Sequence, residues 1–412
     1  MFITHGMVLP RCYRVGVVGT GYVARHFSLA CQSAPDLRIS RVLTRRPMDT
    51  CGEFPLTECL TNSLAELIDT ADVVFECTGD PRHAAEVVDA CFRAKRPVVT
   101  MNAEFHVTAG SYFVGKGLLS EAEGDQPGSQ AALHEQAVAL GFQPIVYGNM
   151  KGFLDHTPTR DAMRQWARRN GISVPMVTAF TDGTKLQIEQ ALVANGLGAT
   201  IAEPGLLGPA VDSLRMAAHI LSQEAHCRGR AIADYVLSPQ LPHGVFVIAQ
   251  HDERERDCLR YLKLGPGPDY VLQNPHILLH LEVPKTIRRV LAEGTPLLDN
   301  GRRPTVSVMT VAKQDLQPGT RIAQGIGSFE VRGIAVMIAD YPGHAPIGLV
   351  ADAIVRRPIK AGDPVALDDI EIPESLALRA WRHTEKQVLR DHVAIALRRR
   401  PAARAGAVRA VR

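Results

Sequence analysis

Short apolar blocks alternate with mixed blocks along the first part of the chain, and their spacing switches repeatedly between strand and helix periods. Strands are predicted at 13–18, 37–43, 73–77 and 97–101. Helices are predicted between them at 22–33, 63–68 and 83–93. Such alternation is typical of a parallel sheet wound by helical crossovers. We therefore predict an α/β domain over residues 1–150, in which a helix at 130–140 and a strand at 143–147 add one more unit.

After residue 148 the pattern changes twice. Helices are predicted at 159–169 and 211–221, an amphipathic helix at 184–197, a strand at 174–180, and short strands within 240–290. These elements predict a central α+β catalytic domain over 151–303. From 304 to 380, short strands broken by Pro-Gly and Gly-Asp turns predict a small β-rich module, in which the phrases 312–322 and 357–367 are half-similar.

Composition and charge exclude several classes of protein. Apolar residues make up 46% and charged residues 22% of the 412 residues, which is ordinary globular composition. The net charge is +3, but residues 391–412 hold six Arg and one Asp, a balance of +5, which leaves the body at 3 − 5 = −2. We therefore expect residues 381–412 to form a solvated basic tail, with no nucleic-acid or membrane partner.

No apolar run reaches the length of a membrane helix, so we expect a cytoplasmic protein. The eight Cys form no CxxC pair, which favours reduced, buried thiols over a zinc site. Whether a divalent metal is needed stays open.

The turn after the first strand has the pattern of a dinucleotide site. Its residues are Gly19, Thr20, Gly21, Tyr22, Val23 and Ala24. The first Gly permits a sharp turn, the second lets the backbone approach a pyrophosphate, and the small third residue lets the helix pack on the strand. This places a Rossmann-type, doubly wound fold and a bound dinucleotide at the start of the chain, the alternative being an unliganded turn.

Polar residues at the next strand ends refine this cofactor prediction. The second strand ends without the carboxylate that would hold a ribose 2′-hydroxyl, and Arg45 and Arg46 stand there instead, which favours NADP(H) over NAD(H). Thr78 and Gly79 end the third strand and are predicted to contact the cofactor, as are Asn102 and Glu104 after the fourth.

A second group of candidate residues lies at 182–189. Lys185 and Glu189 are four residues apart, with Asp182 at the helix start, and Lys151 follows an earlier strand. One interpretation is a helix cap and an exposed ion pair worth about 0.3–0.5 kcal/mol, whose loss would barely change stability. The other is a catalytic lysine that polarises a carbonyl.

The MNAE (101–104), GDQPGS (124–129) and DGTKLQIEQALVANGLG (182–198) phrases resemble the homoserine-dehydrogenase-like oxidoreductases. More narrowly, with the turns after residue 311, the chain resembles the branch with a C-terminal SAF module that includes 1-deoxy-D-xylulose 5-phosphate reductoisomerase-like (DRL) enzymes. The resemblance implies Lys185 as the electrophile, assisted by Lys151, with Asp182 and Glu189 orienting or balancing its charge. Homoserine dehydrogenases carry Asn-Lys where this chain has Asn102-Ala103, which counts against homoserine as the substrate.

The resulting hypothesis is an NADP-dependent oxidoreductase, a reductase or reductoisomerase, that acts as a homo-oligomer. It would reduce the carbonyl of a small polyol, ketose or aldehyde, phosphorylated or free. The alternatives are a dehydrogenase of a small hydroxy acid and a dinucleotide-sensing or scaffold protein without chemistry.

Overall fold

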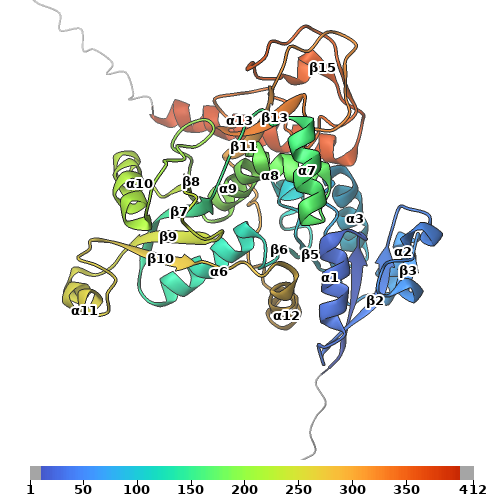
Figure 1. Cartoon of the computed structure of the whole chain (residues 1–412), viewed down its shortest axis with the longest axis horizontal. Coiled ribbons are helices and arrows are strands. Elements are labelled where there is room, and N and C mark those ends of the chain that lie inside the picture. Colours follow the sequence, from blue (N-terminus) through green and yellow to red (C-terminus); the bar gives the residue numbers. More distant parts are fainter. Residues whose placement is uncertain (1–10, 400–412) are drawn as a thin grey trace, which may run out of the picture.

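The computed structural model describes residues 11–399. An N-terminal sheet contains six parallel strands in the order β3-β2-β1-β4-β5-β6, the strand order of a dinucleotide-binding fold, and it confirms the predicted parallel α/β domain. Its strands are β1 (Tyr13–Val18), β2 (Leu37–Leu43), β3 (Leu60–Thr61), β4 (Val73–Glu76), β5 (Val98–Thr100) and β6 (Leu119–Glu121). In Figure 1 this sheet lies at the right, in blue.

Helices cover both faces of the N-terminal sheet, and two of them come from the end of the chain. These helices are α1 (Tyr22–Cys31), α2 (Leu64–Thr70), α3 (Pro81–Arg93), α12 (Val283–Glu293) and α13 (Leu376–Arg399). Val283 and Ile287 of α12 are buried with α1 against one face. Leu378 and Trp381 of α13 are buried with α3 on the other.

This position of α13 corrects the prediction of a solvated tail over 381–412. Residues 381–399 are helical, and Trp381 has only 1% of its surface exposed. The apolar positions 377, 378, 380 and 381 form a short helical stripe. The many arginines around it make the composition of the whole segment look like that of a solvated tail. The rest of the predicted tail, 400–412, lies outside the described residues.

A short irregular segment links β5 to β6. It contains α4 (Ala103–Phe105), a π-helical turn (His106–Gly110) and α5 (Ser111–Phe113). Every residue from Ala103 to Ser111 is buried, so this segment is part of the core.

The second sheet has four strands in the order β10-β9-β7-β8. They are β7 (Gln143–Lys151), β8 (Ile232–Leu237), β9 (Val245–Gln250) and β10 (Asp269–Asn274). The prediction that 143–147 extends the first sheet is wrong, because β7 pairs with β8 and β9. A strand that follows a helix is compatible with either sheet from its local sequence. Its sheet is determined by its partner strands, which come about a hundred residues later in the chain.

Six helices belong to this central part of the chain. They are α6 (Gln126–Ala139), α7 (Arg160–Asn170), α8 (Val174–Thr181), α9 (Thr184–Gly196), α10 (Leu214–Arg228) and α11 (Arg256–Tyr261). Of these, α6, α8 and α9 lie at the candidate site. The strand predicted at 174–180 is instead α8: Ser173 accepts a hydrogen bond from the Met176 N–H as the N-cap, and Pro175 lies in the first turn. Short apolar runs do not distinguish a strand from a buried helix.

Helix α9 is the central helix of the molecule. Every residue from Thr184 to Ala194 is buried, so the predicted amphipathic character is wrong. Three of its polar side chains are hydrogen-bonded within the protein: Thr184 and Gln187 accept from the Gly333 and Ala335 N–H groups, and Gln190 donates to the Tyr147 carbonyl. The C-terminal module is therefore docked on α9.

That module contains two small antiparallel sheets, at the top of Figure 1 in orange and red. One joins β11 (Val306–Ala312) and β13 (Val331–Met337), and the other joins β12 (Arg321–Ile322), β14 (Ala353–Val355) and β15 (Ile370–Glu371). The two half-similar phrases of the sequence pair with each other, because Leu316 and Ile359 exchange both backbone hydrogen bonds.

Candidate functional site

The predicted dinucleotide turn lies between β1 and α1, at the carboxyl edge of the N-terminal sheet. Gly19 has φ +117°, a conformation that disfavours side chains. A Cβ at Gly21 would meet no atom within 4 Å, so the backbone is open to an approaching group. Ala24 is fully buried under β1, Val23 is partly buried, and Tyr22 is 49% exposed. This open cradle at a helix N-terminus fits a pyrophosphate.

Beside this turn, the two arginines after β2 have different partners. The Arg46 guanidinium donates to the Thr20 hydroxyl at 2.7 Å and borders a cavity of about 150 Å³ with Arg25 and Thr50. The Arg45 guanidinium is instead 2.9 Å from the Asp80 carboxylate. Of the two, only Arg46 lines this cavity.

The carboxyl ends of β4 and β5 open into a second cavity, of about 330 Å³. Thr78, Gly79 and Glu104 line one side of it, and α8 and residues 323–326 and 347–352 of the C-terminal module line the other. Asn102 does not face this cavity. It is fully buried, donates to Glu76 and accepts from the Phe105 N–H, so the expectation that it contacts the cofactor is not supported by its orientation.

Lys185 lies in a buried group of carboxylates. Its Nζ is 3.0 and 3.1 Å from the two oxygens of Glu104, and 3.5 Å from Asp125 Oδ2. Its side chain is only 8% exposed, so the exposed helix pair weighed as one interpretation of the sequence is wrong. Burial alone would lower the pKa of Lys185, but Asp125, Glu104 and Glu189 outweigh it and raise that pKa well above its usual range. The ammonium is therefore held in its charged form.

Glu189 and Lys151 lie on the α9 and β7 sides of this group. Glu189 is fully buried, and its Oε2 accepts a hydrogen bond of 3.0 Å from Asn149. Burial, with Asp125 and Glu104, raises the pKa of Glu189 to about 8, against the opposing charges of Lys185 and Lys151. Burial and Lys185 lower the pKa of Lys151, although Glu189 opposes them. The structure thus brings Lys185, Glu189, Lys151 and Glu104 together.

Asp182 is not part of this group. Its carboxylate accepts the Thr184 N–H at 2.8 Å in the turn before α9, whose N-cap is Gly183, and pairs with Lys313 of the C-terminal module at 2.6 Å. The expected role of Asp182, orienting Lys185, is therefore replaced by a role in docking that module.

Sequence reasoning missed several buried ionisable residues next to Lys185. Asp125 precedes α6 but makes no side-chain cap, because its carboxylate turns toward Lys185. Its position in the GDQPGS phrase was the available signal. Glu121 ends β6, and its Oε2 is 3.4 Å from His106 Nε2, with both side chains fully buried. Burial, with Asp125, raises the pKa of Glu121 well above its usual range, and burial lowers the pKa of His106 to about 3.

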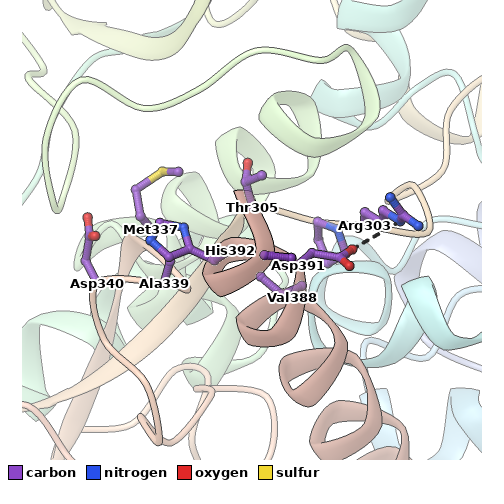
Figure 2. A pocket seen from close by; sticks show the side chains of 10 residues that line it. Arg303, Thr305, Met337, Ala339, Asp340, Val388, Asp391 and His392 are labelled. Atoms are coloured by element: carbon purple, nitrogen blue, oxygen red, sulfur yellow. Dashed lines mark ion pairs between the residues drawn. The ribbon is translucent and has the colours of Figure 1, made fainter. Parts of the chain in front are cut away.

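A further cavity, of about 470 Å³, lies between α13, residues 303–305 and the end of β13 (Figure 2). At one side of it, Arg303 and Asp391 form an ion pair at 3.3 Å. None of the predicted site residues lines it.

Among residues 11–399, no group of three or more His, Cys, Asp or Glu side chains is arranged to hold a metal ion. In the same part of the chain, no helix is long and apolar enough to cross a membrane.

Comparisons with known proteins bear on the class of the protein. Residues 124–283, which include Asp125, Lys151, Lys185 and Glu189, match the family described as "Oxidoreductase DRL, catalytic domain". This match and the N-terminal sheet define the class of the protein: an oxidoreductase of the dehydrogenase type on a dinucleotide-binding fold. No curated protein sequence matches the chain.

Solved structures resemble the chain more distantly. A probable dehydrogenase from Thermotoga maritima is 12% identical, with a TM-score of 0.39 over 69% of this chain and 90% of that chain. The UDP-N-acetylglucosamine 3-dehydrogenase GnnA from Acidithiobacillus ferrooxidans is 12% identical, with a TM-score of 0.40 over 70% of this chain and 92% of that chain. GenD2 from gentamicin A biosynthesis, solved with NAD, is 12% identical, with a TM-score of 0.37 over 72% of this chain and 91% of that chain. Such low TM-scores carry no argument about function.

Proposed function

We propose that the protein is an NADP(H)-dependent oxidoreductase that reduces the carbonyl of a small ketose, polyol-derived ketone or aldehyde, phosphorylated or free. An α-ketol rearrangement before the reduction is the version favoured by the similarity to oxidoreductase DRL. The observation that carries the proposal is a buried, charged lysine, Lys185, which pairs with Glu104 at the edge of the cavity formed by the carboxyl ends of the N-terminal strands.

The turn at 19–24 would hold the pyrophosphate, and Arg46, with Thr20, would hold a 2′-phosphate in the cavity beside β2. When bound, the reduced nicotinamide supplies a hydride to the carbonyl carbon of the substrate. Glu104 holds the Lys185 ammonium near this cavity, where the ammonium donates a hydrogen bond to the carbonyl oxygen. That oxygen gains negative charge as the carbonyl is reduced and takes a proton from the Lys185 ammonium to become the alcohol; Lys185 regains a proton from solvent when the product leaves. The surrounding buried side chains exclude water from the lysine.

A second candidate function, dehydrogenation of a small hydroxy acid, is favoured by Lys151. It ends β7 on the same side of the strand as Asn149, which donates to Glu189, and its ammonium would hold a substrate carboxylate. The rival without chemistry is a dinucleotide sensor. A protein that only binds the dinucleotide has no use for a lysine held in its charged form at the strand edge, so Lys185 counts against this rival.

The test is the consumption of NADPH in the presence of ketoses, aldehydes and 2-oxo acids, phosphorylated and free. We expect oxidation of NADPH with at least one of them, lost in Lys185→Met and retained in Lys386→Met, which removes an exposed lysine on α13. Tight NADPH binding with no turnover across the panel, unchanged in Lys185→Met, would favour the sensor.

A further inference from the structure

A cavity of about 490 Å³ lies on the side of α8 away from the strand-edge cavity. Its walls are apolar and aromatic: Phe153, Met163, Trp166, Ile172, Val177 and Phe180. Phe153 and Trp166 are 63% and 52% exposed, which is unusual for such large apolar side chains and leaves the mouth of the cavity open to solvent.

One ammonium group lies at the inner end of this cavity. Lys151 lines it, and the ring of Phe180 lies 5.3 Å from its Nζ. Among the residues that the structure describes, no carboxylate forms an ion pair with Lys151 and no acceptor takes a hydrogen bond from its Nζ. Two buried lysines nearby are paired: Lys185 with Glu104 and Lys313 with Asp182. Lys151 is only partly buried, and its unpaired ammonium, set among apolar walls, leaves a position for a ligand that supplies the opposite charge.

The cavity is close to the proposed reaction centre. Lys151 ends strand β7, two residues after Asn149, which donates to Glu189. Side chains face the same side of a strand at every second position, so Lys151 and Asn149 point toward the same group. Helix α8 separates the two cavities: Pro175, Met176 and Ala179 line the strand-edge cavity, and Val177, Phe180 and Thr181 line this one.

We propose that this cavity is a substrate subsite for a 2-oxo acid, or the matching 2-hydroxy acid, with an aromatic or branched apolar side chain. Its carboxylate pairs with Lys151, and its side chain packs among Trp166, Phe153 and Val177. The inference rests on the proposed oxidoreductase function and selects the acid substrate from its two candidate classes.

The charge of the cavity favours a carboxylate over a phosphate. Its lining contains one lysine and one exposed histidine, His243, and neither arginine nor a carboxylate. A single ammonium matches the single negative charge of a carboxylate, whereas phosphate sites bring together several donors, often arginines. In the strand-edge cavity, the one arginine, Arg82, is already paired with Asp352 at 3.0 Å.

The test is calorimetric binding of phenylpyruvate, pyruvate and phenyl phosphate to the full-length protein, with and without NADPH. We expect phenylpyruvate to bind about ten- to a hundredfold more tightly than pyruvate, because its ring is buried in the cavity, and more tightly than phenyl phosphate. Phenylpyruvate should also quench the fluorescence of Trp166, one of only two tryptophans, the other being buried in α13.

Two variants remove the two halves of the subsite. Lys151→Met should weaken phenylpyruvate binding about ten- to a hundredfold, with the exposed Lys386→Met as its control. If Lys151→Met does not fold, Trp166→Ala, on the surface of α7, should weaken binding at least threefold. Its control is Met216→Ala, a 46% exposed apolar residue on α10.

The outcomes separate this inference from the proposed function. Equal affinity for phenylpyruvate and pyruvate, tighter binding of phenyl phosphate, or unchanged affinity in both variants overturns the subsite. Tight binding that depends on Lys151, but with no NADPH consumed, supports the subsite and contradicts the oxidoreductase proposal. Consumption of NADPH with small carbonyl compounds, but no preference for apolar acids in binding, supports the oxidoreductase proposal and contradicts the subsite.

Discussion

At the scale of single residues, the main feature of the molecule is that Lys185 is buried with carboxylates. We expect Lys185→Met to lower turnover by about two to three orders of magnitude, as for the loss of one preorganised donor to an oxyanion. It should also destabilise the protein by about 3–5 kcal/mol, because Glu104 and Asp125 lose their buried partner. The sequence alone had indicated almost no change in stability.

Thermal unfolding and steady-state turnover measure the two effects. The double variant Lys185→Met with Glu104→Gln should recover part of the stability but none of the turnover. Recovery of both would assign Lys185 a purely structural role.

Glu121 makes the stability depend on pH. The folded protein keeps a proton on this carboxyl well above its ordinary pKa of 4.5, where the unfolded chain has released it, so stability falls as pH rises from 4.5. His106 acts in the opposite sense: its pKa is lowered from 6.5 to about 3, so stability falls as pH drops from 6.5 toward 3. Above pH 6.5 the effect of His106 is gone, and Glu121 acts together with Glu189, whose pKa is raised to about 8, to lower stability as pH rises.

We therefore expect Glu121→Gln to flatten the loss of stability above pH 6.5, by up to about 1.4 kcal/mol per pH unit. Denaturant unfolding at several pH values measures the slope. Glu58→Gln, which changes an exposed carboxylate, is the control. An unchanged slope would show that Glu121 is ionised in the folded protein.

Cofactor choice should depend on Arg46 more than on Arg45. We expect NADPH to bind about tenfold or more tightly than NADH, and Arg46→Ala to remove that difference. Arg45→Ala should change it less, because the Arg45 guanidinium pairs with Asp80 away from the cavity. Dissociation constants for both cofactors test this, with the exposed Arg38→Ala on β2 as control. Equal affinities in the unmodified protein contradict the preference.

At the scale of elements, α9 serves two purposes from two faces. Lys185 and Glu189 face the buried site, while Thr184 and Gln187, with Asp182 before them, hold the C-terminal module. Asp182→Asn should leave Lys313, whose side chain is 4% exposed, without its partner and cost about 3–5 kcal/mol. Asp161→Asn, which breaks an exposed pair with Arg164, should change stability by less than about 1 kcal/mol. Comparable unfolding curves for the two variants would contradict the docking role.

The sequence was informative where local chemistry decides the element. The turn at Gly19 and Gly21, four of the six strands of the first sheet and the helices α1, α2 and α3 follow from hydrophobic period and glycine geometry, and they lie within two residues of the predicted positions. The short strands β3 and β6 were not predicted. The sequence failed where distant partners decide. The sheet of β7, the helical state of α8 and the burial of Lys185 depend on residues far along the chain. Of the candidate site residues, Lys185, Glu189, Lys151 and Glu104 meet, while Asp182 and Asn102 point elsewhere.

At the scale of the whole molecule, the C-terminal helix is part of the first domain. A chain that ends near Leu397 should fold like the full chain, as the sequence had suggested for the arginine-rich end. A chain that ends before Leu376 should lose the packing of Leu378 and Trp381 against α3 and melt well below the full-length protein. Melting temperatures of the three chains test this, and equal values would contradict the assignment of α13 to the core.

The return of α12 and α13 to the first sheet also has a consequence for synthesis. Ribosomes add about 5–20 residues per second, and domains generally fold as they emerge. Here the nascent N-terminal sheet leaves the ribosome long before the helices that cover it, so parts of both faces stay exposed for about tens of seconds. We expect this protein to complete its first domain only once α13 has been synthesised, and its yield in cells to depend on chaperones that bind exposed apolar strands.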